Sequence, residues 1–496
     1  MKHTRFFHKH RPLLKWLLLG TLFALGGSIT VLCIWYRSAF NMPFKELLFT
    51  MMSPLQGTGQ STVQLVISSC LPAVIILLFL TVVVIWKFVR HPEQYPTLRR
   101  VAAWVSVATF LGSLILSVFA FRIPEYLSTL SEKTLIYEEH YVDPTTVTLT
   151  AEGKPKNLIY IFMESMETTY ASVEEGGAQG PNYMPNLTGL AKENLSFSDS
   201  TLLGGFHTPS GTGWTMGALM GMTSGVPYSL AVLGEQSHNS MSKYQSFAPG
   251  LTTLGDLLKE QGYVQEFLCG SDASFAGRDH YFAQHGDYEI FDLFTARKEK
   301  YIEEDYYVWW GFEDAILYEI AKDELLELAD GDAPFNFTML TVDMHHVNGY
   351  VCNLCQKNYG NRLANVVSCA DRQLSAFIDW CREQEFYKDT VIVIAGDHPR
   401  MDTTLVSGVD YYDRTMYNCF LNVDTKVQGR VQERVFTTFD LFPTTLAAMG
   451  FSIEGERLGL GTNLFSDLPT LAEEFGYEWL DTEISKYSSY YFKHFS

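Results

Sequence analysis

Three uncharged apolar stretches near the N-terminus constrain the fold of this 496-residue chain more than any other feature. They cover residues 17–36, 65–86 and 101–121, and none contains Asp, Glu, Lys or Arg. Each is about twenty residues long, which is what a helix needs to cross a hydrocarbon layer of roughly 30 Å. The sequence therefore predicts a transmembrane region of three helices over residues 1–121.

The basic residues around these stretches predict their orientation. Lys and Arg are frequent before the first stretch and between the second and third, whereas the segment between the first and second has only Arg37 and Lys45. By the positive-inside rule, the N-terminus and the 87–100 loop face the cytoplasm. Three crossings then place everything after residue 121 outside it. We interpret the first stretch as an anchor, because no clear small-residue cleavage site follows it.

The net charge of the chain argues against a nucleic-acid-binding protein. The net charge is −20 although the N-terminal region is basic, so the exported part is strongly acidic. Because contacts to nucleic-acid phosphates need Lys and Arg, we expect no nucleic-acid partner.

In an oxidising compartment the exported cysteines are disulfide candidates, with fifteen pairings if all six pair. No second CxxC accompanies Cys352 and Cys355, which favours a disulfide or free thiols there over zinc. The six are Cys269, Cys352, Cys355, Cys369, Cys381 and Cys419.

Short apolar runs in the exported part alternate with helix-like stretches. Residues 157–162, 335–342 and 390–395 are almost continuously apolar. Strands that are buried on both faces of a parallel sheet have this pattern. The sequence therefore predicts an α/β domain with a central, mostly parallel sheet.

The predicted boundaries follow from these patterns. Residues 122–155 carry few long apolar runs and are interpreted as a juxtamembrane linker. The α/β domain is assigned to residues 156–465. Residues 466–496 are rich in aromatic side chains and are expected to form a helical tail, whose role the sequence does not indicate.

Each predicted strand is followed by carboxylate or imidazole side chains. The carboxyl ends of parallel strands meet at one edge of a sheet, where ligands bind in open α/β folds. Carboxylates and imidazoles are ligands of divalent cations. A solvated turn is the alternative for each group taken alone, but three groups at equivalent positions favour a metal site. The residues are Glu164 after the first strand, Asp343, His345 and His346 after the second, and Asp397 and His398 after the third.

A threonine in the segment Gly211-Thr-Gly-Trp-Thr215 is a candidate nucleophile. Small and apolar residues follow this segment and are compatible with a closely packed helix. Thr212 would then lie at or near the N-cap, a position where Thr is common. The free N–H groups and positive dipole of a helix N-terminus suit a phosphate and an alkoxide. The alternative is that Thr212 only caps the helix.

Together these segments resemble a known family. The segments YEEHYVDP (137–144), NLIYIFMESME (157–167), GTGWT (211–215), DMHH (343–346) and GDH (396–398) are similar, in order, to those of phosphoglycerol transferases. That group includes lipoteichoic acid synthase and, more closely, the phosphoglycerol transferases of periplasmic glucans. It is the exported, sulfatase-like branch of the alkaline-phosphatase superfamily. The similarity runs from about residue 137 to 465.

The resemblance implies a set of site residues. The family's metal ligands fall on Glu164, Thr212, Asp397 and His398, and Thr212 matches its nucleophile. The resemblance favours Mn²⁺, while the mixed oxygen and nitrogen donors also suit Mg²⁺ or Zn²⁺. The substrate-binding residues it implies are Arg278 and His345, with His346 as a substitute for His345; His345 would also act in catalysis. Where the synthase has a tryptophan two residues before this arginine, the chain has Ala276.

The expected activity is transfer of glycerophosphate from phosphatidylglycerol to a hydroxyl acceptor through a phospho-threonine intermediate. The acceptor would be a glycerophosphate polymer, a glycolipid or a glucan, and the enzyme would reside in a bacterial plasma membrane as a multi-pass protein. Two alternatives remain, a phosphoethanolamine transferase and a non-catalytic binding protein with the same fold. Phosphoethanolamine transferases usually carry a cysteine where this chain has Ser210. An arylsulfatase is disfavoured, because no C/S-x-P-x-R segment is present.

Overall fold

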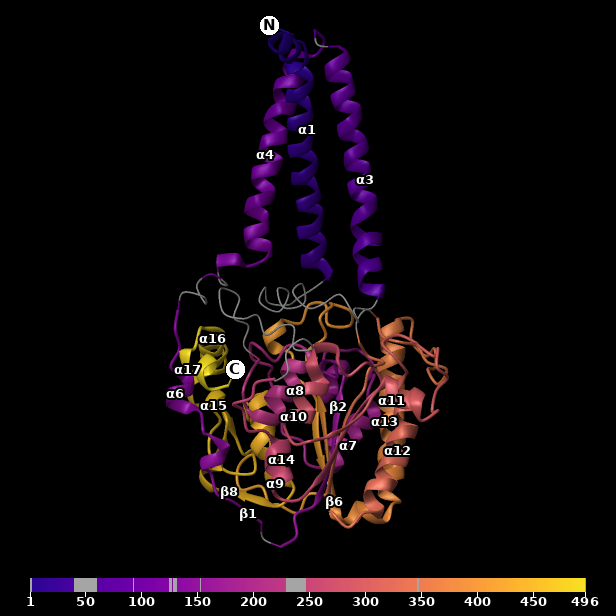
Figure 1. Cartoon of the computed structure of the whole chain (residues 1–496), viewed down its shortest axis with the longest axis vertical. Coiled ribbons are helices and arrows are strands. Elements are labelled where there is room, and N and C mark those ends of the chain that lie inside the picture. The colour runs from indigo at the N-terminus through magenta and orange to yellow at the C-terminus, as the bar shows by residue number, and fades with distance from the viewer. Residues whose placement is uncertain are drawn as a thin grey trace. The chain divides into compact units, whose positions relative to one another are not determined.

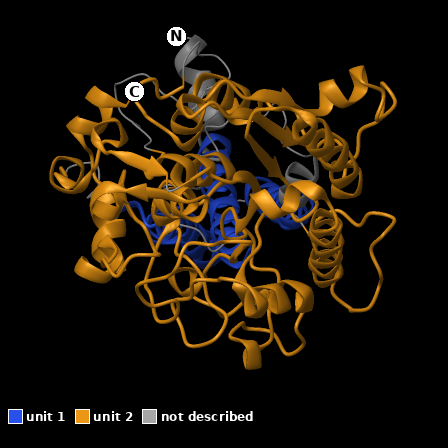
Figure 2. Cartoon of the chain, turned by 90° about the horizontal axis from the view of Figure 1, so that it is seen from below, with its two compact units in different colours: residues 1–45, 59–128 blue, residues 46–58, 129–496 orange. Residues whose placement is uncertain are grey.

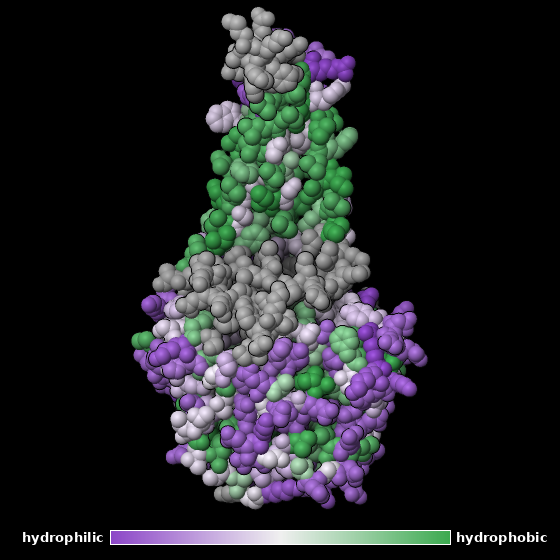
Figure 3. Space-filling model, viewed as in Figure 1, coloured by the Kyte–Doolittle hydropathy of each residue, from purple (hydrophilic) through white to green (hydrophobic). Residues whose placement is uncertain are grey.

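The three apolar stretches lie in three long helices of the computed structural model. These are α1 (Lys2–Ala39), α3 (Gln60–Arg90) and α4 (Pro96–Ala120). The segments Leu13–Ala39, Ile67–Arg90 and Pro96–Ala120 are long and apolar enough to cross a membrane. Large apolar side chains such as Phe79, Trp104 and Phe119 point outward, and Figure 3 shows these helices covered by apolar side chains. The predicted apolar helices are confirmed.

Small residues set the packing of these helices on one another. Helix α1 packs against both α3 and α4. A Cβ on Gly26 would lie 2.7 Å from Cα of Phe110 in α4, and a Cβ on Gly27 would lie 2.4 Å from a methyl group of Leu77 in α3. The two glycines therefore allow a close approach of the helix backbones, as small residues commonly do between membrane helices.

The chain divides into two compact units, coloured separately in Figure 2. The first comprises residues 1–45 and 59–128, and the second comprises residues 46–58 and 129–496. Within them the structure describes residues 2–39, 60–91, 93–124, 127, 132–151, 153–228, 247–345 and 348–495.

The second unit is built on a six-stranded sheet with the order β4-β3-β5-β2-β6-β7. Strands β4, β3, β5, β2 and β6 are parallel to one another, and β7 is antiparallel to β6 at one edge. The predicted α/β class with a mostly parallel sheet is confirmed. The strands are β2 (Asn157–Met163), β3 (Val264–Cys269), β4 (Glu289–Phe291), β5 (Phe335–Leu340), β6 (Thr390–Gly396) and β7 (Asn418–Leu421).

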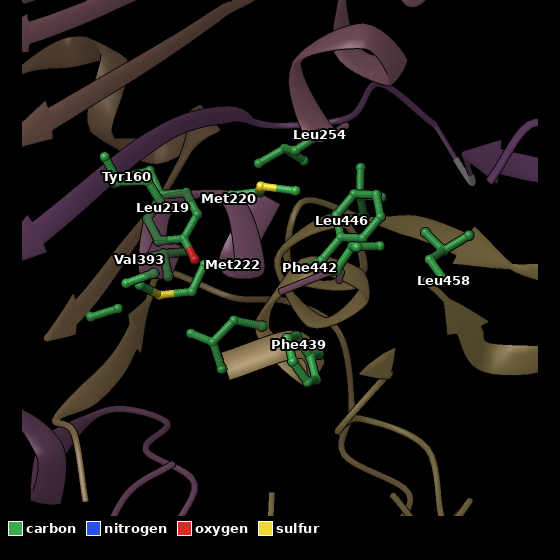
Figure 4. Close-up of a cluster of buried hydrophobic side chains, with 14 of the residues drawn as sticks. Tyr160, Leu219, Met220, Met222, Leu254, Val393, Phe439, Phe442, Leu446 and Leu458 are labelled. Carbon is green, nitrogen blue, oxygen red and sulfur yellow. The ribbon is translucent and has the colours of Figure 1, made fainter. Parts of the chain in front are cut away.

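Both faces of this sheet are buried, which explains the continuous apolar strands. In β2, Tyr160 and Phe162 belong to one hydrophobic core, and Ile159 and Ile161 belong to the other. Figure 4 shows part of the first core, where Tyr160 lies near methionine and leucine side chains of α8. The first core is covered by α8 (Thr215–Ser224), α9 (Leu254–Glu260), α10 (Arg278–Gln284) and α14 (Leu441–Ala448), and the second by α7 (Pro185–Glu193), α11 (Leu293–Lys298), α12 (Asp314–Asp330) and α13 (Arg362–Arg382) (Figure 1).

The segments on either side of the predicted α/β domain pack into the same unit. Ile136 and Tyr137, from the segment expected to be a linker, are buried in the first core. The tail is helical, and Tyr491 from it contacts Tyr137 with ring centroids 5.6 Å apart. These segments therefore extend the core of the second unit. The elements of these two segments are α6 (Ile136–His140), β1 (Leu149–Ala151), α15 (Leu471–Phe475), α16 (Tyr477–Ser485) and α17 (Ser489–His494). Strand β1 pairs with β8 (Phe451–Ile453) near the end of the predicted α/β domain, where β9 (Arg457–Leu458) pairs with β10 (Gly461–Thr462).

Candidate active site

The register of the central strands brings two of the predicted site residues together. Met163 at the end of β2 lies opposite Gly396 at the end of β6. Glu164 and Asp397 are the next residues along each strand, so they are neighbours at the carboxyl edge of the sheet. The backbone N–H of Asp397 donates to the carbonyl of Met163 (3.0 Å), and that of Glu164 donates to Oγ1 of Thr341 after β5 (3.0 Å).

His398 completes a buried three-residue cluster with Glu164 and Asp397. One candidate ligand atom from each residue lies within 4.8 Å of the other two. His398 Nε2 lies 3.6 Å from Glu164 Oε1 and 3.6 Å from Asp397 Oδ2. Nδ1 of the same ring lies 2.9 Å from the carbonyl of Pro399. A proton on Nδ1 would be donated there, which leaves Nε2 available as a ligand, as is usual for metal-binding histidines.

The electrostatics of this cluster fit a divalent cation. Burial, and then the charge of Glu164, raise the pKa of Asp397 to about 7. Burial opposes ionisation of Glu164, but its interactions with His345, His398 and Arg400 and the hydrogen bond from Ser165 together outweigh it, so the pKa of Glu164 is lowered. Asp397 Oδ2 is buried and has no hydrogen-bond partner among the described residues. A cation between these groups would offset both the desolvation and the repulsion.

Ser165 holds the two carboxylates in place through a strained backbone. Its φ is +50°, in the left-handed region that a residue with a Cβ rarely adopts. In this conformation its N–H donates to Asp397 Oδ1 (2.7 Å) and its hydroxyl donates to Glu164 Oε1 (2.8 Å). Strain of this kind is typical of residues that orient functional groups.

The hydrogen bonds of the Thr212 hydroxyl are made with residues outside this cluster, whereas the sequence predicted Thr212 as a metal ligand. Thr212 is fully buried. Its Oγ1 donates to the carbonyl of Pro209 (2.7 Å) and accepts a hydrogen bond from Oγ1 of Thr438 (3.3 Å). Its methyl group packs against α8, because a Cβ added to Gly221 of this helix would lie 3.1 Å from that methyl group. The Thr212 side chain is therefore part of the packing around α8.

Thr215 occupies the position that was expected for Thr212. Helix α8 begins at Thr215 and has Trp214 as its N-cap, so it starts later than the sequence indicated. The Thr215 hydroxyl lies 3.4 Å from Glu164 Oε2 and 3.4 Å from His398 Nε2. Among the described residues no side chain caps the helix, and the N–H groups of a helix N-terminus suit an anion.

The sequence contained a signal for Thr215 that was missed. Both threonines lie in one five-residue segment, and only the start of the helix distinguishes them. A Cβ on Gly217 would lie 2.3 Å from the carbonyl oxygen of Gly211, so the first turn packs directly on the preceding loop. Gly211 itself has a φ of +88°, which turns the chain immediately before Thr212. Gly211 in the loop and Gly217 in the first helical turn are therefore the sequence signal that the helix begins after the loop.

The predicted substrate-binding residues have different surroundings. His345 follows β5, which pairs with β2 in the sheet, and a positive charge on His345 would lower the pKa of Glu164. Its ring packs on Trp310, with centroids 4.4 Å apart. His346 lies outside the described residues.

Arg278 is buried and donates to its own loop. Its Nε donates to the carbonyl of Phe275 (3.1 Å), and its Nη2 donates to Oγ of Ser271 (3.0 Å) and to the carbonyl of Asp272 (2.6 Å). The guanidinium group therefore stabilises the turn before α10. A contact between Arg278 and a substrate phosphate stays a prediction.

A buried network of charged residues beside the cluster was not expected from the sequence. The backbone N–H of Arg400 donates to Glu167 Oε1 (2.8 Å), and its Nη1 donates to the carbonyl of Met344 (2.7 Å). Glu167 also forms an ion pair with Arg414. Arg400, Glu167 and Arg414 are all fully buried. The network ties the segments after β2, β5 and β6 together, and its residues are adjacent to the motifs, although the sequence does not reveal their burial.

Comparisons with known proteins agree with this geometry. The family described as Sulfatase matches residues 156–451. Phosphoglycerol transferase I from Xanthomonas campestris pv. campestris is 31% identical over 347 residues, which cover 68% of this chain and 47% of that protein. The protein of the same name from Shigella boydii serotype 18 is 30% identical over 433 residues, which cover 85% of this chain and 52% of that protein. The chain thus spans about half the length of these relatives.

A solved structure supports the fold. The lipoteichoic acid synthase LtaP from Listeria monocytogenes is similar with a TM-score of 0.50 and 19% identity, and the match covers 64% of this chain and 79% of the other. At this identity the likeness concerns the fold alone. The resemblance inferred from the motifs is confirmed by the family match and the named relatives.

Proposed function

Because this chain belongs to the sulfatase family, we propose that it is a membrane-anchored, metal-dependent phosphotransferase that moves glycerophosphate from phosphatidylglycerol to a hydroxyl acceptor. The observation that carries the proposal is the buried cluster of Glu164, Asp397 and His398 with the Thr215 hydroxyl beside it. The relatives named phosphoglycerol transferase I support the choice of transferred group. The acceptor would be a glycerophosphate polymer, a glycolipid or a glucan.

The three apolar helices give the proposal a physical basis. A phospholipid donor does not leave the bilayer, so an enzyme that uses it gains from being held at the same surface. The segments 13–39, 67–90 and 96–120 would each cross the bacterial plasma membrane. Basic residues before the first helix and between α3 and α4 favour the cytoplasmic side for those ends. The second unit would then act outside the cytoplasm.

The cluster has the ligands that a divalent cation needs. Glu164, Asp397 and His398 would hold Mn²⁺, with Mg²⁺ or Zn²⁺ as alternatives for the same oxygen and nitrogen donors. When bound, the cation would supply Lewis-acid activation of a hydroxyl group and would neutralise phosphate charge. Ser165 would keep both carboxylates oriented, because its N–H and hydroxyl already bond them.

Thr215, in place of Thr212, is proposed as the nucleophile. Its hydroxyl group gives its proton to water, Oγ1 attacks the phosphorus of the lipid, an O–P bond forms, and the P–O bond to diacylglycerol breaks. His345 would donate a proton to the departing diacylglycerol oxygen. In the second displacement His345 takes the proton of the acceptor hydroxyl as that oxygen attacks phosphorus, and Thr215 takes a proton from water as its O–P bond breaks. The N–H groups at the start of α8 would bind the phosphate oxygens.

Arg278 and His346 remain proposed phosphate contacts. For Arg278 this requires that Nη1 reach the phosphate while Nε and Nη2 keep their bonds to the loop. A guanidinium group that is fixed in this way would present the remaining donor without further ordering.

The proposal is tested by following both halves of the donor lipid. The full chain is reconstituted with phosphatidylglycerol labelled in the headgroup, and separately with labelled phosphatidylethanolamine, together with glucan and glycolipid acceptors and Mn²⁺. We expect diacylglycerol release from phosphatidylglycerol and transfer of its label to one acceptor. Turnover of phosphatidylethanolamine alone would instead identify a phosphoethanolamine transferase. Absence of turnover and of metal binding would identify a non-catalytic protein.

A further inference from the structure

A second cluster of ligand-type side chains lies in the loop between β5 and α13. It consists of the thiols of Cys352, Cys355 and Cys369, whose sulfur atoms all lie within 4.8 Å of one another. Cys352 Sγ is 3.6 Å from Cys355 Sγ and 3.7 Å from Cys369 Sγ. All eight cysteines of the chain are in described segments, and each is a free thiol.

The spacing of these sulfur atoms fits shared ligands of one metal ion. Bonded sulfurs of a disulfide are about 2.05 Å apart. Thiolates bound to zinc lie about 2.3 Å from the ion, and two ligands at a tetrahedral angle are then about 3.8 Å apart. The two measured distances are close to the second value. A disulfide between any two of the cysteines would also leave the third thiol without a role, whereas a metal uses all three.

The surroundings suit thiolate ligands. Gln373, one helical turn after Cys369, directs its Nε2 at both Cys369 Sγ (3.5 Å) and Cys352 Sγ (3.9 Å). N–H donors of this kind stabilise the negative charge on metal-bound sulfur. Cys352 and Cys369 are buried, whereas Cys355 is half-buried. The fourth ligand of a tetrahedral ion at this cluster would be a water molecule on the side of Cys355.

We propose that Cys352, Cys355 and Cys369 form a structural zinc site that fixes the loop between β5 and α13. The site would join residues 352 and 355 of the loop to the second turn of α13. Two arginines of the helix already hold the same loop, because Arg362 donates to the carbonyl of Gly349 (3.0 Å) and Arg372 donates to that of Leu354 (3.3 Å).

This site is distinct from the cluster of Glu164, Asp397 and His398. Soft thiolates select Zn²⁺, whereas carboxylates with one imidazole also accept Mn²⁺ and Mg²⁺. The sequence alone favoured a disulfide or free thiols, because Cys352 and Cys355 have no second CxxC. The third ligand, Cys369, joins them only because α13 packs beside the loop.

Metal analysis of the purified full chain tests the proposal. After expression with zinc and exhaustive exchange into Mn²⁺ buffer, elemental analysis should find about one tightly held zinc per chain. A mercurial thiol reagent should release it, as followed with a chromogenic zinc chelator. Cys355→Ala and Cys369→Ala should lower the retained zinc about tenfold or more. Asp397→Asn, in the other cluster, should leave it unchanged.

The matched control is Cys381→Ala, which removes another buried thiol of the same helix and should retain the zinc. Because a core variant can fail to fold, circular dichroism accompanies each protein, and the release of zinc from the unmodified chain by the mercurial stands independently of the variants. The proposal is overturned if the unmodified chain retains no zinc. It is equally overturned if intact mass and peptide mapping find a disulfide among the three cysteines, or if Cys355→Ala and Cys369→Ala fold and keep their zinc.

Discussion

Replacing Thr215 and Thr212 separately by valine distinguishes the two threonines of the 211–215 segment. Valine keeps the shape of threonine and removes only the hydroxyl group. The Thr215 hydroxyl is half-exposed and lies 3.4 Å from both Glu164 Oε2 and His398 Nε2. The Thr212 hydroxyl is fully buried and makes hydrogen bonds of 2.7 and 3.3 Å. The two substitutions should therefore have opposite effects on activity and stability.

The magnitudes follow from these contacts. Loss of the nucleophile in Thr215→Val should lower the turnover rate at least about 10³-fold, which corresponds to about 4 kcal/mol in the activation free energy. Its long hydrogen bonds should contribute less than about 1 kcal/mol to stability. Thr212→Val removes two hydrogen bonds of a buried hydroxyl group, although the Pro209 carbonyl keeps the backbone N–H of residue 212 as a donor (2.9 Å), so it should cost about 1 kcal/mol of unfolding free energy. Its turnover rate per folded molecule should stay within about tenfold of the unmodified enzyme.

The assay measures diacylglycerol released from phosphatidylglycerol by each protein in detergent, with thermal unfolding recorded on the same samples. Mass spectrometry after brief incubation with donor lipid should find glycerophosphate on Thr215 in the unmodified enzyme and on no residue in Thr215→Val. The reasoning is refuted if Thr215→Val turns over normally, or if folded Thr212→Val is inactive and the modified peptide carries the group at Thr212.

Four further outcomes are expected. Chelation should abolish turnover, Mn²⁺ should restore it, and Glu164→Gln should weaken Mn²⁺ binding at least about tenfold by calorimetry, because one of three ligands is lost. Mn²⁺ affinity should rise about tenfold per pH unit up to a pH of about 7 and then level off, because the raised pKa of Asp397 means that the ion displaces a proton below that pH. In the metal-free protein the pKa of Asp397 is higher than in the unfolded chain, so the contribution of Asp397 to stability is present at low pH and is lost as the pH rises through about 7. Thermal scans of Asp397→Asn should show a smaller dependence of stability on pH. An unchanged pH profile would contradict the assignment. Arg414→Met should cost about 3–5 kcal/mol in denaturant unfolding, because it leaves Glu167 buried and unpaired, whereas Lys322→Met, at a surface ion pair, should change stability by less than about 1 kcal/mol.

The sequence allowed prediction of the metal-type residues because their arrangement is local to each strand end. In a parallel sheet, a residue that directly follows a strand lies at the same edge as its counterparts on the neighbouring strands. Glu164 and Asp397 are each one residue beyond paired strand ends, and His398 is adjacent to the second. Identifying three strands was therefore enough to expect these groups in one place.

The position of the threonine could not be predicted in the same way. A helix start depends on how the first turn packs on the loop before it, which is a tertiary contact between Gly217 and Gly211. Because the helix begins later than predicted, Thr212 packs against the helix and Thr215 lies next to the cluster. The hydrogen bonds of Arg278 to the loop of residues 271–275 could not be predicted either, because they depend on a turn that no pattern in the sequence specifies. Its contact with a phosphate stays a prediction.

The sequence by itself determined the three apolar helices, the α/β class and the chemical types at the strand ends, because apolar runs and strand-end residues are properties of contiguous segments. The tertiary structure alone decided which hydroxyl group faces the carboxylates and which three thiols meet. Both depend on the packing of a helix against a loop, and that packing is fixed by contacts between residues that are separated in the chain.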